Sequence, residues 1–330
     1  MNPRASGGVR DVRTGRGRTV KSVWEAIVLL VLAATYSPVS QLNLSPVYGA
    51  IPASIYHRSL TLAAILTAMT VKTMLKNYLP VNVAKLTPIL AFSIPTIQFF
   101  LFRQSSQMGA TYGPLVTEAL TYFPLVFLSI FGARDLLDLL DLSQYGGSIR
   151  FAGPSILSCA LFSGAQKFSA LVLKRNIGSN LLLTRSGLQI VLASIYAWML
   201  PSKITLFAIL PLLHSAFFNV HISLGLTSAL LNETLHANNY SLVARQDSST
   251  GYISVLDNTR DGFRVMRCDH SLLGGEWFHI PANAETGLRE PIYAVFAMLE
   301  AVRLVQPVGR EEGYTVTDSQ KNALVMFVRP

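Results

Sequence analysis

Residues 24–39 read WEAIVLLVLAATYSPV and carry one charged side chain, Glu25. Similar apolar runs recur as far as Leu231, and so many long uncharged stretches could not all be buried in one water-soluble core. A membrane-spanning helix needs about 20 mostly apolar residues. The sequence therefore predicts an all-α polytopic membrane helical bundle of about seven spans, followed by a small α+β region of β-hairpins plus a helix.

Seven apolar runs have the length and composition of spans. They are residues 24–39, 59–75, 86–102, 115–131, 151–172, 181–200 and 204–231. Run 181–200 is the weakest, because Arg185 lies inside it. A cleaved signal peptide that included residues 26–34 would still leave several spans.

The charges divide the chain into three parts. Residues 1–231 hold 18 Lys/Arg and 6 Asp/Glu, a net +12, whereas residues 232–330 hold 9 and 12, a net −3. We predict a basic flexible tail at 1–23, a transmembrane helical domain at 24–231 and a soluble region at 232–330. The cations lie in the tail and at helix ends, which indicates a cytosolic N-terminus and argues against nucleic-acid binding. The side of the membrane for residues 232–330 stays open, because it depends on run 181–200.

Polar side chains inside the predicted spans are candidates for function, because burying them in lipid is costly. One interpretation is a pathway for a proton or cation, as in a transporter. The other is that they extend to the membrane surface or form hydrogen bonds between helices. These intramembrane polar residues are Glu118, Lys167, His214, Asn219 and His221.

The soluble region is predicted to contain strands at 252–256 and 263–268, a turn at 257–262 between them, and a turn at Gly274-Gly275. A helix opened by Glu290-Pro291 is expected to pack on this hairpin. Adjacent side chains of a strand point to opposite faces, so Cys268, Asp269 and His270 cannot converge on one ion. No metal site and no catalytic constellation are predicted.

This region contains the segments TGYISV at 250–255, FRVMRCDHSLLGG at 263–275 and EPIYAVF at 290–296. Together these segments resemble the polyamine (spermidine/spermine) synthase family, in its fungal membrane-attached form. The family transfers an aminopropyl group from decarboxylated S-adenosylmethionine to an amine such as putrescine. The resemblance implies that Tyr252, Asp269, Glu290 and Tyr293 line the amine or nucleotide pocket.

The sequence also departs from that family. Ile253 and Ala294 replace its usual glutamine and histidine, and no glycine-rich nucleotide-binding turn follows residues 322–325. We therefore expect a truncated aminopropyltransferase-related membrane protein that is inactive alone. No cofactor is expected in this chain, and decarboxylated S-adenosylmethionine would be the co-substrate of a longer form. The alternative is a multi-pass transporter or membrane scaffold with a small regulatory soluble domain. Expected partners are the lipid bilayer, a polyamine or nucleotide ligand, and a protein bound through the exposed hairpin.

Overall fold

The computed structural model describes residues 7–75, 83–137, 147–248 and 250–277. The chain separates into two compact units. The helical unit comprises Met1–Leu231 together with Gln246–Tyr252, and the sheet unit comprises Asn232–Arg245 and Ile253–Pro330. The helical unit therefore includes the end of one strand and the beginning of the next.

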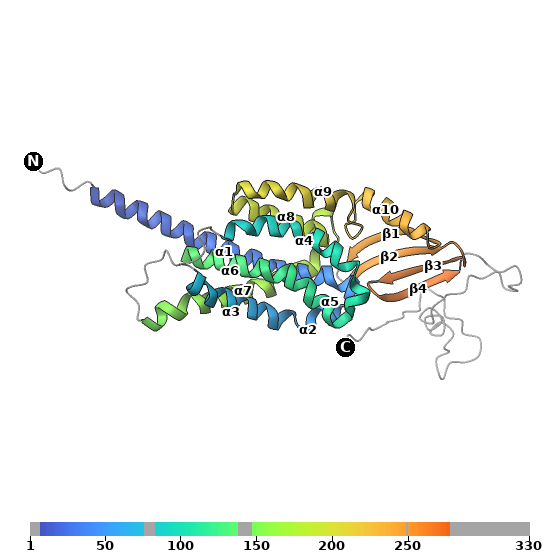
Figure 1. Cartoon of the computed structure of the whole chain (residues 1–330), viewed down its shortest axis with the longest axis horizontal. Helices are drawn as coiled ribbons and strands as arrows, with labels where there is room; N and C mark the ends of the chain where they lie inside the picture. The colour runs from blue at the N-terminus through green and yellow to red at the C-terminus, as the bar shows by residue number, and fades with distance from the viewer. Residues whose placement is uncertain (1–6, 76–82, 138–146, 249, 278–330) are drawn as a thin grey trace, which may run out of the picture. The chain divides into compact units, whose positions relative to one another are not determined.

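Helices make up most of the described chain, and Figure 1 labels them. They are α1 (Gly7–Tyr48), α2 (Ala50–Ile55), α3 (His57–Leu75), α4 (Thr87–Phe102), α5 (Ser105–Leu120), α6 (Tyr122–Leu137), α7 (Gly147–Asn176), α8 (Arg185–Met199), α9 (Ile209–Phe217) and α10 (Gly225–His236). Short 3₁₀ turns occupy η1 (Val83–Leu86), η2 (Leu181–Leu183) and η3 (Lys203–Ala208).

Helix α1 is the centre of the helical unit and packs against α6, α7 and α8. Its alanines Ala26, Ala33 and Ala34 are fully buried. Small side chains let neighbouring helices approach closely, which explains why α1 can contact several helices at once. Helices α3 and α6 pack together, as do α4 and α8. Tyr36 and Tyr196 are buried in the same core.

Within the described residues, four helical stretches are long and apolar enough to cross a membrane. They are Val20–Tyr48, Val83–Phe102, Ser105–Arg134 and Ser155–Asn176. The predicted fold class, with about seven spans in an all-α bundle, is therefore wrong on two points. The described residues hold four candidate spans, and the helical unit includes strand residues at 246–248 and 251–252.

The length of unbroken helix explains the overcount. The predicted span 181–200 contains the 15-residue helix α8, which is about 22 Å long and shorter than the roughly 30 Å hydrocarbon layer. The predicted span 204–231 is divided among η3, the 9-residue helix α9 and part of α10. Apolar composition alone does not reveal such interruptions.

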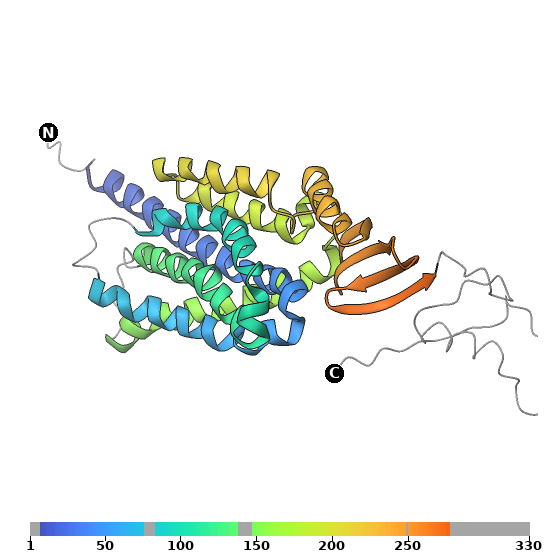
Figure 2. The ribbon, with the colours of Figure 1, turned by 45° about the vertical axis from the view of Figure 1, so that its right-hand side comes forward.

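The four described strands form one sheet in the order β1 (Tyr240–Ser248), β2 (Gly251–Asn258), β3 (Phe263–Cys268) and β4 (Ser271–Trp277), which Figure 1 labels and Figure 2 shows from a second direction. Strand β3 pairs antiparallel with both β2 and β4, and Val265 lies opposite Leu256 and Gly275. Val265 and Leu256 are buried.

Strand β3 occupies the residues predicted for it, and β2 extends the predicted strand at 252–256. The turn predicted at Gly274-Gly275 is wrong, because both glycines pair with β3 inside β4. The chain reverses instead at Asp269, whose φ is 50°. Strand β1 was not predicted. The helix predicted after Glu290 lies outside the described residues.

Candidate functional site

A buried ionisable pair lies inside the helical unit. His57 is the first residue of α3, and Glu118 lies in the last turn of α5. The His57 Nδ1 and Glu118 Oε1 atoms are 2.6 Å apart, and each side chain is 3% exposed. Burying either group alone would be costly, so each one depends on the other.

Three further side chains extend this pair into a buried hydrogen-bond chain. Ser40 Oγ donates to Glu118 Oε1 over 3.0 Å, and Ser37 Oγ lies 2.7 Å from His57 Nε2. Gln166 Nε2 donates to Ser37 Oγ over 2.7 Å. A neutral His57 with its proton on Nδ1 gives every donor in this chain an acceptor, since Nε2 then accepts from Ser37.

The buried chain joins four helices: α1 supplies the serines, and α3, α5 and α7 supply one residue each. The His57 ring also stacks on Tyr122 of α6, with centroids 5.2 Å apart. Chemically, the pair can hold a proton between two basic atoms. Its demonstrable effect is structural, because satisfied buried polar networks fix how helices pack.

A second buried ion pair ties the tip of the β1–β2 hairpin to the start of α8. Asp247 Oδ1 accepts from Arg185 Nε over 2.6 Å, and Asp247 Oδ2 accepts from the Arg185 backbone N–H over 2.9 Å. A carboxylate is favoured there because a helix N-terminus carries partial positive charge. The Arg185 guanidinium carbon also lies 4.7 Å from the centroid of the Tyr252 ring.

Gly178 is needed for this arrangement. Its φ is +79°, and an added Cβ would lie only 1.9 Å from the backbone oxygen of Asp247. Gln246 Nε2 donates to the Gly178 oxygen over 3.3 Å. All of these residues belong to the helical unit. The hairpin tip is therefore held by a specific contact and not by apolar packing alone.

The candidate ligand-binding residues from the sequence lie in different parts of the chain. Tyr252 contacts Arg185 in the helical unit. Asp269 lies in the β3–β4 turn of the sheet unit. Glu290 and Tyr293 lie outside the described residues.

The candidate polar residues of the predicted spans lie in different places in the helical unit. Glu118 belongs to the buried hydrogen-bond chain, whereas Lys167 is exposed on α7.

The other three candidates lie beside α4. Asn219 is buried and donates from Nδ2 to the Pro95 oxygen over 3.0 Å. His214 Nδ1 lies 3.2 Å from Thr96 Oγ1. His221 has an exposed side chain and packs edge-on against Phe99 and Phe102 of α4. These three side chains therefore all contact α4, and none of them takes part in the hydrogen-bond chain that contains Glu118.

Sequence reasoning missed His57, Arg185 and Asp247 as interacting residues. His57 lies in a short connection between two predicted spans, and Arg185 and Asp247 are 62 residues apart. The spacing of Ser37 and Ser40 was an available signal, because residues three apart share one helix face. Nothing in the spacing identified their partners.

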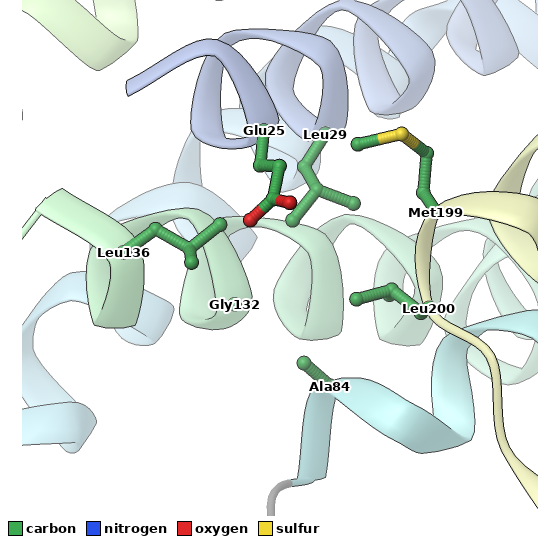
Figure 3. Close-up of a pocket in the computed structure, with 7 residues that line it drawn as sticks. All are labelled: Glu25, Leu29, Ala84, Gly132, Leu136, Met199 and Leu200. Atoms are coloured by element: carbon green, nitrogen blue, oxygen red, sulfur yellow. The ribbon is translucent and has the colours of Figure 1, made fainter. Parts of the chain in front are cut away.

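A small cavity of about 70 Å³ lies elsewhere in the helical unit, between α1, η1, α6 and the end of α8. Figure 3 shows the Glu25 carboxylate among the apolar side chains of Leu29 and Leu136. Lys21 Nζ lies 3.8 Å from Glu25 Oε1. Glu25 is thus a partly exposed carboxylate paired with Lys21.

Comparison with known proteins gives one clear relative. The chain is 44% identical over 300 residues to a protein from Emericella nidulans, and the match covers 90% of the chain. That protein is named an N-terminal histidine N-methyltransferase. The chain spans about half of its length, 53%. No protein-family model matches the chain, and no solved structure matches it.

This relative overturns the predicted family. The relative is named for methyl transfer, whereas polyamine synthases transfer an aminopropyl group, so the predicted aminopropyltransferase ancestry is wrong. The resembling segments 250–255 and 263–275 lie in a hairpin sheet. Their alternation and turn residues are common to many hairpins and carry no donor chemistry.

The associated predictions are corrected by the same relative. Decarboxylated S-adenosylmethionine as co-substrate and a polyamine function do not agree with a methyltransferase. This relative does not support the expectation that the chain uses no cofactor either. The alternative of a multi-pass transporter or membrane scaffold is also wrong, because the relative is named as an enzyme.

Proposed function

We propose that this chain takes part in the N-methylation of an N-terminal histidine of a polypeptide. The observation that supports this proposal is the 44% identity to the Emericella nidulans enzyme over 90% of the chain. S-adenosylmethionine is the methyl donor that we infer for such an enzyme.

The described residues do not fit that donor. A nucleotide of this kind is commonly held by a glycine-rich turn that leads from a parallel strand into a helix N-terminus. The described strands form a meander instead; of the glycines with positive φ, Gly251 begins β2 and Gly262 lies in the turn before β3. We therefore assign no methyl-transfer step to the described side chains.

We also propose that the helical unit is embedded in a membrane, with the basic tail on the cytosolic side. Four candidate spans support this location. Large apolar side chains are also exposed on the surface of the helical unit. They include Trp24 (63%), Ile156 (68%), Phe168 (70%), Trp198 (79%) and Leu210 (69%). Large apolar side chains left exposed in this way favour a surface that contacts lipid or another protein.

Disruption of the gene in its host tests the function, because it does not require the chain to be sufficient for catalysis. Mass spectrometry of host polypeptides that begin with histidine should show loss of methylation of that residue, restored by re-expression of the gene. Polypeptides with other N-terminal residues serve as the control. Unchanged methylation of N-terminal histidines would exclude the proposal.

Extraction of cell membranes at alkaline pH tests the location separately. A membrane-embedded chain should stay in the pellet and enter solution only with detergent. Recovery of the chain in the aqueous supernatant would contradict the membrane location and leave the proposed methylation open to its own test.

A further inference from the structure

An apolar groove of about 280 Å³ runs along α7, between it and α1 and α8. Its lining includes Val31 of α1, Phe168 and Val172 of α7, and Leu188 of α8. Two polar side chains of α7 in the lining use their donors on their own helix: Ser169 Oγ donates to the Gln166 oxygen and Asn176 Nδ2 to the Val172 oxygen. The groove thus suits a flexible hydrocarbon chain.

The outer face of α7 continues this apolar surface. Phe168 is 70% exposed and Leu171 is 63% exposed. Only 22% of the apolar window in Ser155–Asn176 is buried, compared with 44–61% in the other three candidate spans. Helix α7 is therefore the candidate span with the most surface left for lipid.

Two cations lie at the end of α7 where the groove ends. Lys174 and Arg175 are in its last turn, both exposed, and Asn176 and Ile177 of the groove follow them directly. Residues three and four apart share a helix face, so Arg175 lies one turn beyond Leu171 and Val172, and Lys174 lies one turn beyond Leu171. Arg175 therefore lies one turn beyond Val172 at the edge of the groove, whereas Lys174 lies one turn beyond Leu171 on the exposed face outside the groove lining.

The sign of the charge at this end favours an anion. Two full positive charges exceed the partial negative charge of a helix C-terminus, which is roughly half an elementary charge. Arginine also binds phosphate oxygens in a two-pronged geometry. Asp247, a carboxylate of the nearby hairpin tip, is already paired with Arg185.

We propose that the groove between α1, α7 and α8 binds an acyl chain of an anionic phospholipid, with its phosphate held by Lys174 and Arg175. This inference rests on the membrane location proposed above. A phospholipid suits the site because apolar groove and cationic end adjoin, which matches a molecule with a hydrocarbon tail and an anionic headgroup. The basic end distinguishes this site from general contact with lipid tails.

Native mass spectrometry of the full chain in mild detergent tests the site, using phosphatidylinositol and phosphatidylcholine with identical acyl chains. The unmodified chain should retain more phosphatidylinositol than phosphatidylcholine. Two cations near a membrane surface correspond to about a tenfold to thirtyfold preference at low salt. The double variant Lys174→Gln/Arg175→Gln should lose that preference while still retaining phosphatidylcholine.

Two further variants complete the design. Ala165→Phe places a ring in the groove and should reduce retention of both lipids, because Ala165 lines it. The control Lys85→Gln/Lys203→Gln removes two exposed cations of η1 and η3, which are not at the end of α7, and should leave the preference unchanged.

The alternative outcomes are distinguishable. Equal retention of the two lipids by the unmodified chain, or an unchanged preference in Lys174→Gln/Arg175→Gln, would overturn the lipid site. A lipid-free dimer that Ala165→Phe dissociates would identify the face as an interface between two copies instead. Recovery of the chain from cells without detergent would reject the membrane location itself, whereas the proposed methylation has its separate gene-disruption test.

Discussion

The His57 imidazole and the Glu118 carboxylate lie 2.6 Å apart inside the helical unit, although 61 positions separate them in the sequence. Ser37 and Ser40 of α1 approach the two groups from a third helix. Correct packing of α1, α3 and α5 is therefore coupled to the pairing of these two ionisable side chains.

Removal of the carboxylate should destabilise this packing. Glu118→Ala leaves His57 and Ser40 buried without their acceptor, and the expected loss is about 3–5 kcal/mol. Glu118→Gln keeps the volume and one oxygen acceptor, so its loss should be smaller. Thermal unfolding in detergent measures both. Glu233→Gln, on the exposed face of α10, is the matched control; similar transition temperatures for all three variants would contradict the buried pair.

Gly113 of α5 should not accept a larger side chain. A Cβ at this position would lie 2.1 Å from Cε1 of the Tyr48 ring, which is held by a 3.2 Å hydrogen bond between its hydroxyl and Thr117. Gly113→Ala should cost about 1–3 kcal/mol through overpacking. Gly164→Ala on α7 meets no atom within 4 Å, and should be neutral or stabilise the helix by up to about 1 kcal/mol. Thermal unfolding that ranks the two variants in the opposite order would refute the predicted contact.

Arg185→Lys should loosen the hairpin tip while keeping the charge. Lysine cannot reproduce the Nε contact with Asp247 together with the stacking on Tyr252, so we expect a loss of about 1–3 kcal/mol. Hydrogen exchange of the backbone amides at 246–252 should become faster. Arg58→Lys, which changes an exposed arginine of α3, is the control. Equal exchange rates in the two variants would show that the ion pair does not hold the tip.

The sheet should become less stable at acidic pH through one cross-strand pair. Arg264 donates from Nε and Nη2 to Asp257 over 2.6 and 2.8 Å, and this hydrogen bonding lowers the pKa of the Asp257 carboxyl below its ordinary value of 3.8. The folded state therefore binds the proton less readily than the unfolded state. The stability from this pair is present above the ordinary pKa and is lost as pH falls through the lowered one.

Comparison with Arg264→Gln isolates that contribution. The pair is partly exposed, 45% for Arg264 and 20% for Asp257, so the difference at neutral pH should be below about 1 kcal/mol. This difference in stability should vanish at strongly acidic pH. Hydrogen exchange of β2 and β3 in the full chain measures the stability, and carbon NMR of the Asp257 carboxyl measures its pKa. A pKa that does not rise in the variant would contradict the expectation.

Local patterns in the sequence located some elements well. Strand β3 follows a run of turn-forming residues that ends at Gly262, whose φ is +74°, so its start was predictable. The next reversal was misplaced because a glycine pair is a common turn signal. The backbone turns instead at Asp269, a residue type that tolerates positive φ because its short polar side chain bonds locally.

The limits of span prediction have a similar origin. The apolar run 204–231 has the composition of a span, but its backbone is divided among η3, α9 and α10. Hydropathy measures composition along the chain and does not register where helical hydrogen bonding stops. The buried partners of Glu118 were equally invisible, because no pattern along the sequence links His57 to it.

The sequence by itself determined that most of this chain is apolar helix, that strands follow at 252–256 and 263–268, and that residues 1–231 carry a net positive charge. These properties arise from composition and short-range periodicity, which local physical chemistry controls. Only the tertiary structure decided the pairing of His57 with Glu118 and of Arg185 with Asp247, because burial makes each charged or polar group depend on a partner that is distant in sequence.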